Sequence, residues 1–298
     1  MKKIWIILLI VFLSGCSSTE KIKMMVPYGS PQLSQLYLQD NQNLYDVDIV
    51  IGADPLVAAF GSNSHDVIFA PINLGAKMFN SKEDYVLLGV VTWGNYYLVS
   101  ATEILDFNSL NQKNIIVFGR NQVSDILIQY LIREYQIEVE ITYVDSLSTA
   151  TAHAIVHPND IVMVAEPSFS LLKKDNSSLY SIDLQEAFQE VSVDDSFPQA
   201  GVFVHQRVKA ETRLSIQEDL IESINQMNQN ADETAELAVR LGIDLDRDVL
   251  LSSFISSNIH FKSATESKSA IINFFNLILE INPGLIGNKL PNETFYVE

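Results

Sequence analysis

The segment Val67-Ile68-Phe69-Ala70-Pro71-Ile72-Asn73 carries the pattern that decides the fold. Its four apolar residues predict a strand, and Pro71 follows at the point where a helix opens, running through Asn73 and Met78. A strand that passes directly into a helix is the repeating unit of α/β proteins with a largely parallel sheet.

The same unit recurs on both sides of this segment. Strands are predicted at residues 23–26, 47–51, 85–91, 115–118, 139–144, 161–164 and 199–204, and 96–100 continues the fourth strand of the chain. Residues that open a helix follow six of the strands: Ser30, Asp54, Pro71, Ser124, Ser148 and Glu166. Long helices are predicted at 215–229, 232–241 and 267–280.

This spacing also predicts where a ligand would bind. Open parallel sheets bind ligands beyond the carboxyl ends of their strands. Helix N-termini at that edge present unpaired backbone N–H groups, which make a polar surface without any basic side chain. We therefore expect two α/β sets, the second beginning near Leu110, with a polar crevice between them.

The N-terminal residues predict export from the cytoplasm. Lys2 and Lys3 precede an apolar run at residues 4–13, and Ser14, Gly15 and Cys16 follow it. The run is shorter than the roughly 20 residues that span a bilayer, and the segment resembles a bacterial lipoprotein signal. The resemblance implies a signal peptide at 1–15, lipidation of Cys16 and a tether at 16–21. An ordinary signal peptide with an incidental cysteine is the alternative.

Composition excludes several classes of protein. The 298 residues are 47% hydrophobic and carry 19 basic and 37 acidic side chains, a net charge of −18. Cleavage before Cys16 would remove two bases and no acid, leaving 17 against 37, or −20. Such a charge argues against nucleic-acid binding, because phosphate contacts need basic patches. With a single cysteine, an internal disulfide and cysteine-based metal sites are excluded.

Several motifs together resemble a known family. They are the signal ending in Cys16, the run 66–73, Trp93-Gly94-Asn95-Tyr96-Tyr97, Ala165-Glu166-Pro167 and the ending 290–296. The chain is similar in these motifs to substrate-binding lipoproteins of ABC importers, in the subgroup that binds thiamine precursors, nitrate, taurine and alkylsulfonates.

The resemblance implies an α/β fold of the periplasmic-binding-protein type (type II), with two lobes joined by two crossover strands. Residues 22–98 and 201–298 would form lobe 1, and residues 99–200 would form lobe 2. The crossovers would lie near 99–101 and 199–202. Ligand would bind between the lobes and pass to a membrane permease.

Three aromatic residues are candidates for ligand contact. Trp93 and Tyr96 lie where the chain is expected to cross between lobes, and an aromatic ring there can stack on a planar ligand. Tyr28 follows the first strand and has the same interpretation. The alternative is packing between the lobes, which applies to Trp93 in particular because tryptophan is largely buried in most proteins.

Polar candidates lie at helix starts and at the return crossover. Asn73 and Gln199 can each hydrogen-bond a ligand. The alternative for Asn73 is a local bond to the backbone, and the alternative for Gln199 is a turn position that faces solvent. Glu166 can accept hydrogen bonds from an amine or aminopyrimidine, or simply cap its helix. Arg120 and Ser124 in the loop at 119–124 can hold an anion, with a solvated Arg120 as the alternative.

Metal and catalytic sites are poorly supported by sequence. His153 and His157 have helical spacing, but Pro158 follows at once, and a helix-terminal interaction explains them better. No nucleophile elbow occurs. We therefore predict no catalytic residue, no metal and no cofactor. A metal-binding lipoprotein, which would need a third ligand, and a surface sensor or assembly factor without a transported ligand are the remaining alternatives.

The sequence thus predicts a monomeric, lipid-anchored, extracytoplasmic solute receptor that is not an enzyme. A nitrogen heterocycle related to thiamine precursors would use Tyr28, Trp93, Tyr96 and Glu166. A small oxyanion or sulfonate would instead use helix N-termini and Arg120.

Overall fold

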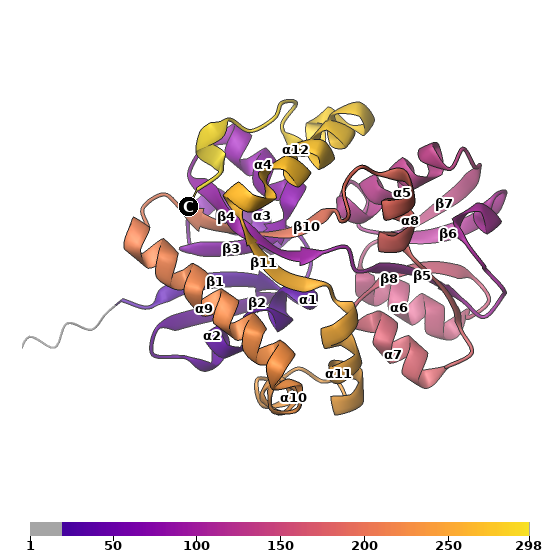
Figure 1. The fold of residues 1–298 in the computed structure, drawn as a ribbon, viewed down its shortest axis with the longest axis horizontal. Helices are drawn as coiled ribbons and strands as arrows, with labels where there is room; N and C mark the ends of the chain where they lie inside the picture. The colour runs from indigo at the N-terminus through magenta and orange to yellow at the C-terminus, as the bar shows by residue number, and fades with distance from the viewer. Residues whose placement is uncertain (1–19, 298) are drawn as a thin grey trace, which may run out of the picture.

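The computed structural model describes residues 20–297, and these residues form two β-sheets flanked by helices (Figure 1). The predicted signal peptide, Cys16 and most of the predicted tether lie outside the described residues. The first sheet contains β1 (Ile22–Pro27), β2 (Tyr45–Val50), β3 (Val67–Pro71), β4 (Tyr85–Trp93), β10 (Pro198–His205) and β11 (Ile259–Ser263). The second contains β5 (Tyr96–Ser100), β6 (Lys113–Phe118), β7 (Val139–Val144), β8 (Ile161–Ala165) and β9 (Tyr180–Asp183).

The two sheets have matching strand orders. The six-stranded sheet runs β2-β1-β3-β10-β4 with β11 at its edge, and the five-stranded sheet runs β7-β6-β8-β5-β9. In each, three parallel strands are followed by one antiparallel strand, β10 in the first sheet and β5 in the second. The predicted α/β class is confirmed. We call the six-stranded sheet with its helices lobe 1, and the five-stranded sheet with its helices lobe 2.

The helices begin close to the predicted residues. They are α1 (Ser30–Leu33), α2 (Leu36–Asp40), α3 (Asp54–Ser62), α4 (Ile72–Ser81), α5 (Val123–Glu134), α6 (Leu147–Val156), α7 (Ser168–Asp175), α8 (Leu184–Val191), α9 (Ala210–Gln229), α10 (Ala231–Arg240), α11 (Arg247–Ser256) and α12 (Ala264–Ile281). Short 3₁₀ turns lie at Phe107–Leu110, Pro283–Ile286 and Glu293–Phe295. The sequence patterns missed α8, α11, β9 and β11. Among residues 20–297, no helix has the length and apolar character that crossing a bilayer requires.

The chain passes from lobe 1 to lobe 2 at Gly94–Asn95, between β4 and β5. Gly94 has a positive φ of 39°, and an added Cβ would lie 1.8 Å from Oε1 of Gln185, so glycine is required here. Because β5 lies wholly in the five-stranded sheet, the passage comes a few residues before the expected crossover at 99–101. The domain boundaries at 98/99 and 200/201 stay a prediction.

Hydrophobic packing continues across the junction between the lobes. One large cluster of buried side chains includes residues of both sheets, and a smaller one covers the other face of the five-stranded sheet. Phe197 links the lobes within the large cluster. Its ring stacks on Tyr96 at 6.0 Å and on Phe274 of α12 at 6.1 Å, and meets Phe188 of α8 edge-on at 5.3 Å. Each such pair adds about 0.5–1.5 kcal/mol beyond simple burial.

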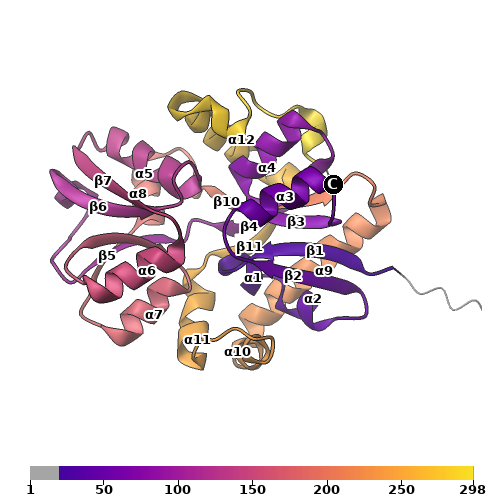
Figure 2. The ribbon, with the colours of Figure 1, turned by 180° about the vertical axis from the view of Figure 1, so that it is seen from behind.

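Two C-terminal helices of lobe 1 reach lobe 2 on opposite sides of the junction (Figures 1 and 2). Helix α12 contacts α5, where Arg133 pairs with Glu280 at 3.0 Å. Helix α11 contacts α7. The lobes are therefore joined by packed helices as well as by the connecting strands.

Candidate ligand-binding site

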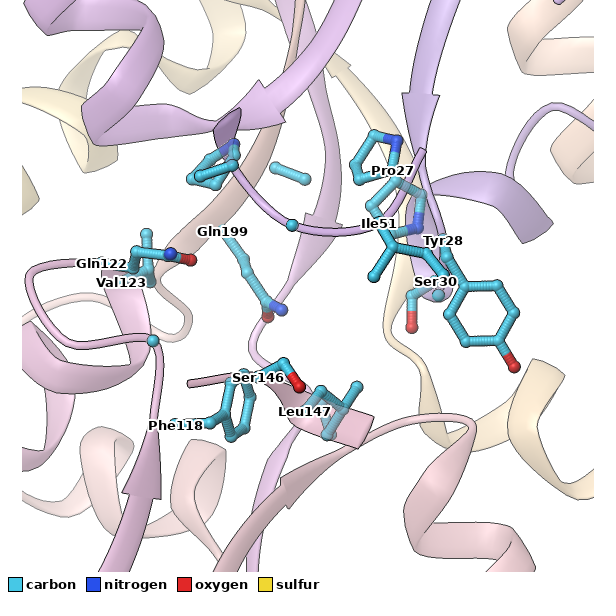
Figure 3. Close-up of a pocket in the computed structure, with 18 of the residues that line it drawn as sticks. Pro27, Tyr28, Ser30, Ile51, Phe118, Gln122, Val123, Ser146, Leu147 and Gln199 are labelled. Atoms are coloured by element: carbon cyan, nitrogen blue, oxygen red, sulfur yellow. The ribbon is translucent and has the colours of Figure 1, made fainter. Parts of the chain in front are cut away.

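A cavity of about 200 Å³ lies between the two lobes, at the carboxyl ends of their parallel strands (Figure 3). The crevice that the sequence predicted is therefore present. From lobe 1 the lining includes Pro27, Tyr28, Gly29, Ser30, Ile51, Gly52, Ala53, Leu56 and Pro71, and from lobe 2 Phe118, Gly119, Gln122, Val123, Asp145, Ser146, Leu147, Ser148, Ala165 and Glu166. The segments between the lobes add Asn95, Tyr96, Gln199 and Ala200.

Helices α3, α5 and α6 are among those that direct their N-termini at this cavity. Ala53 precedes α3, Gln122 precedes α5 and Ser146 precedes α6, and all three residues line the cavity. The first turns of these helices carry N–H groups without a partner inside the helix and a partial positive charge. The cavity is therefore suited to hydrogen-bond acceptors, including anionic ones.

An aromatic surface forms one side of the cavity. Tyr96 packs edge-on against Phe118 with ring centroids 5.8 Å apart, and both residues line the cavity. Burial raises the pKa of the Tyr96 hydroxyl far above its ordinary value, so this group stays neutral. The surface can therefore stack a planar ligand.

Amide and hydroxyl side chains provide polar contacts near the point where the chain crosses between lobes. Asn95 N donates to Oε1 of Gln199 at 3.2 Å, and Asn95 Nδ2 donates to Oγ of Ser30 at 2.6 Å. Oδ1 of Asn95 is buried and has no partner among residues 20–297. The Gln199 side chain extends into the middle of the cavity (Figure 3).

Glu166 lines the cavity, but its carboxylate is occupied elsewhere. Oε1 accepts from Ser170 Oγ at 2.9 Å and from Ser256 Oγ, and Oε2 accepts from Ser170 N at 3.2 Å. Burial raises the pKa of Glu166, and the hydrogen bonds from both serines oppose this effect. These bonds use three of the carboxylate's acceptor positions, and the burial of Glu166 leaves little of its surface for the expected ligand contact.

Trp93 does not line the cavity. Its side chain is buried, with Nε1 donating to the carbonyl oxygen of His260 at 3.2 Å and the indole stacked on the His260 ring at 5.4 Å. Lys262 Nζ lies 4.7 Å from the ring centroid. The structure thus places Trp93 against β11, which matches the packing alternative.

Asn73, Arg120 and Ser124 also lie outside the lining. Asn73 Nδ2 donates to the carbonyl oxygen of Asn121 at 3.5 Å, which is a contact between lobes. Arg120 is exposed, and its guanidinium lies 5.0 Å from the ring centroid of Tyr143. Ser124 Oγ donates to the carbonyl oxygen of the last residue of β6 at 2.7 Å. Arg120 and Ser124 therefore do not line the cavity, although Gly119, Gln122 and Val123 of the same loop do.

Tyr28 and Ile51 lie at the edge of the cavity. Tyr28 is 41% exposed, and burial together with the negative charge of Asp244 raises the pKa of its hydroxyl. Ile51 is 71% exposed, which is unusual for a large aliphatic side chain at a cavity. Of the eight predicted contacts, the structure therefore gathers Tyr28, Tyr96, Glu166 and Gln199 around one cavity.

Sequence reasoning missed several lining residues, notably Asn95, Phe118, Gln122, Asp145 and Ser146. Phe118 ends β6 and Asp145 directly follows β7, while Asn95 and Ser146 lie two residues beyond a strand end, a signal that was available once the strand ends had been placed. Asp145 and Glu166 are the charged residues of the lining, and within residues 20–297 no lysine, arginine or histidine lines it.

The histidine pair does not form a metal site in the described part of the chain. His153 Nε2 lies 2.7 Å from Oδ2 of Asp160, and the rings of His153 and His157 are 4.7 Å apart. No group of three or more metal-ligating side chains with suitable geometry occurs among residues 20–297.

Comparison with known families gives a clear match. The model of a family described as menaquinone biosynthesis matches residues 58–280, which is more than half of the chain. The chain belongs to this menaquinone biosynthesis family. No curated protein sequence matches this family member.

Solved structures show which fold this member of the menaquinone biosynthesis family has. An ABC transporter structure from Parabacteroides distasonis superposes with a TM-score of 0.82 and 23% identity, covering 93% of this chain and 99% of the other. The zinc-bound ligand-binding component of an ABC-type import system from Staphylococcus aureus superposes with a TM-score of 0.70 and 14% identity, covering 94% of this chain and 97% of the other. The periplasmic aliphatic sulphonate binding protein SsuA from Escherichia coli superposes with a TM-score of 0.69 and 12% identity, covering 94% of this chain and 94% of the other. The predicted periplasmic-binding-protein fold is confirmed, and with it the resemblance in fold to binding proteins of ABC transporters.

Proposed function

We propose that the protein is an extracytoplasmic solute receptor of an ABC importer, which captures a small molecule between its lobes and delivers it to a membrane permease. The cavity lined by both lobes carries this proposal. A ligand there gains its full set of contacts only when both lobes surround it, so binding favours the closed arrangement. The ABC transporter structure and the ligand-binding component of an ABC-type import system, which share this fold, support the same function.

The first candidate ligand is a neutral or cationic planar nitrogen heterocycle related to thiamine precursors. The Tyr96–Phe118 surface offers stacking, and the side-chain amides of Gln122 and Gln199 offer both donors and acceptors. The absence of basic side chains from the described lining favours a ligand without strong negative charge. Micromolar affinity would correspond to about −8 kcal/mol.

The second candidate is a small oxyanion or sulfonate. The N-termini of α3, α5 and α6 at the cavity favour it, because backbone N–H groups and helix dipoles can hold an anion without Arg120. The two candidates predict different ligands for the same cavity and can be compared directly.

A binding test on the chain beginning at residue 17 separates these candidates. Thermal unfolding is measured with hydroxymethylpyrimidine and thiamine in one arm, and with nitrate, taurine and an alkylsulfonate in the other. A ligand at 100 times its Kd should stabilise the protein by about 2.7 kcal/mol. No shift in either arm would contradict both ligand candidates.

Two variants locate the binding site. Gln199→Ala should weaken binding several-fold, since a lost hydrogen bond costs about 0.5–1.5 kcal/mol. Arg120→Ala is the matched control and should bind as the parent does, because Arg120 lies outside the cavity. Loss of binding in the Arg120 variant alone would place the site at the 119–124 loop instead.

The family description favours a biosynthetic enzyme as a second function. The two functions differ in the fate of the ligand, which a receptor releases unchanged. Incubation with each ligand that binds, followed by mass spectrometry, should recover it unaltered, and conversion to a product would overturn the receptor proposal.

We also propose a lipid anchor at Cys16 and a monomeric receptor. The expected result is that the full chain partitions with membranes and that Cys16→Ala does not. Membrane partition of that variant would remove the anchor from the proposal.

A further inference from the structure

Glu166 connects the two lobes through its side chain. The residue precedes α7 in lobe 2 and is 1% exposed. Its Oε1 accepts hydrogen bonds from Ser170 in α7 and from Ser256 at the end of α11 in lobe 1. A single carboxylate oxygen therefore bonds helices of both lobes.

The main chain of the same residue continues this connection toward the cavity. Glu166 N donates to the carbonyl oxygen of Asn95 at 3.3 Å, and the Glu166 carbonyl oxygen accepts from Ser30 Oγ at 3.2 Å. Ser30 also receives the hydrogen bond from Asn95 Nδ2 and lies 3.3 Å from Ser257 Oγ. Because Ser30 and Asn95 line the cavity, its polar residues are connected to the α7–α11 contact.

Neighbouring side chains strengthen the contact between α7 and α11. Tyr97 Oη donates to the carbonyl oxygen of Ser256 at 2.9 Å, and its ring stacks on Phe169 of α7 at 3.9 Å with an interplanar angle of 6°. Lys174 of α7 pairs with Asp246, which precedes α11. Both ends of α11 are thus attached to lobe 2.

We propose that Glu166 is a positioning residue, and that its hydrogen bond to Ser256 holds the two lobes together at the α7–α11 contact. Glu166 acts on the cavity through Ser30 and Asn95 and does not contact the ligand. A buried carboxylate that loses a donor is left partly unsatisfied, so separating α7 from α11 is strongly disfavoured. Relative motion of the lobes then concentrates away from this contact, across a cavity that has Ile51 of lobe 1 and Leu147 of lobe 2 on opposite sides (Figure 3).

The test measures the spacing of the lobes without any ligand, so it is independent of the proposed function. Cys16 is the only cysteine in the sequence, so the chain beginning at residue 17 has none. Val57→Cys in α3 and Ile155→Cys in α6 place spin labels at exposed positions of lobe 1 and lobe 2. Pulsed electron paramagnetic resonance then gives the distribution of distances between the lobes.

Removing the Glu166–Ser256 hydrogen bond should widen the distribution of distances between the lobes. Glu166→Ala and Ser256→Ala should each add a population at longer distances, and the double variant should add no more than Glu166→Ala does. Glu166→Gln keeps an acceptor oxygen and should restore most of the parent distribution. Ser252→Ala is the matched control, because Ser252 is exposed one turn earlier in α11, and it should leave the distribution unchanged.

The outcomes decide the proposal. Parent-like distributions in both Glu166→Ala and Ser256→Ala would overturn it. If circular dichroism shows that Glu166→Ala does not fold, Ser256→Ala alone decides, since it removes only the donor from lobe 1. Equal widening by Ser252→Ala would also overturn it, because the effect would then belong to α11 in general.

Discussion

Glu166 places an ionisable group where water hardly reaches it, at the junction of the lobes. Removing a carboxylate from water favours its protonated form, whereas donors from Ser170 and Ser256 favour its ionised form. Burial has the larger effect, so the pKa lies above its ordinary value of 4.5. The protonation of this one residue is therefore coupled to folding.

The raised pKa predicts a pH dependence of stability for the parent that Glu166→Gln lacks. Between the ordinary and the raised pKa, the native chain keeps a proton that the unfolded chain has lost. The free energy of unfolding of the parent, relative to Glu166→Gln, should therefore be greatest below the ordinary pKa and fall as pH rises through the raised pKa. Urea unfolding of both proteins from about pH 4 to neutral pH measures this difference, and a difference that stays constant would contradict it.

Trp93 and Glu166 illustrate how far sequence predicts individual residues. The sequence predicted a strand ending at Val91, two residues short of Trp93 where β4 ends, and a helix opening at Glu166, two residues before α7 begins. The direction of each side chain depends on partners far along the chain, His260 for Trp93 and Ser256 for Glu166. A strand buried on both faces carries no alternation that would show which way Trp93 points.

Helix α4 shows how one element is fitted to the sheet beneath it. An added Cβ at Gly75 would lie 1.9 Å from the ring of Phe203, a buried residue of β10. Gly61 lies in the last turn of α3, where an added Cβ would meet nothing within 4 Å. Close packing, and not backbone conformation, therefore distinguishes these two glycines.

These two glycines give a matched pair of substitutions. Gly75→Ala should lower the free energy of unfolding by about 1–3 kcal/mol, because the buried ring has to move. Gly61→Ala should raise it by up to about 1 kcal/mol, because alanine favours the helix. Urea denaturation measures both, and changes of the same sign and size would contradict the packing argument.

Elements were predicted best where strand and helix signals are local. The openings of α1, α3 and α4 lie at or next to Ser30, Asp54 and Pro71, because the proline at each helix start acts within one turn. Helix α11 and strand β11 were missed. Ser263 and Glu266 form a capping box for α12, which a search for that pattern would have found.

At the scale of the whole molecule, the shared core predicts cooperative unfolding. Phe197 packs against both lobes, and the large hydrophobic cluster includes residues of both sheets. The chain beginning at residue 17 contains a single tryptophan, Trp93, at the junction. Its fluorescence and the far-ultraviolet circular dichroism should therefore follow one common urea transition. Two separate transitions would show that the lobes unfold independently.

The interleaved strand order has a consequence for how the protein assembles during synthesis. Strands β3 and β4 are not neighbours, because β10 lies between them and pairs with both. A nascent chain that ends before Pro198 thus leaves a gap in the first sheet, whereas Tyr96–Asp183 already contains every strand of the second. The middle of the polypeptide is therefore able to fold first, and the ribosome must finish about two thirds of the message before β3 and β4 acquire the strand that joins them.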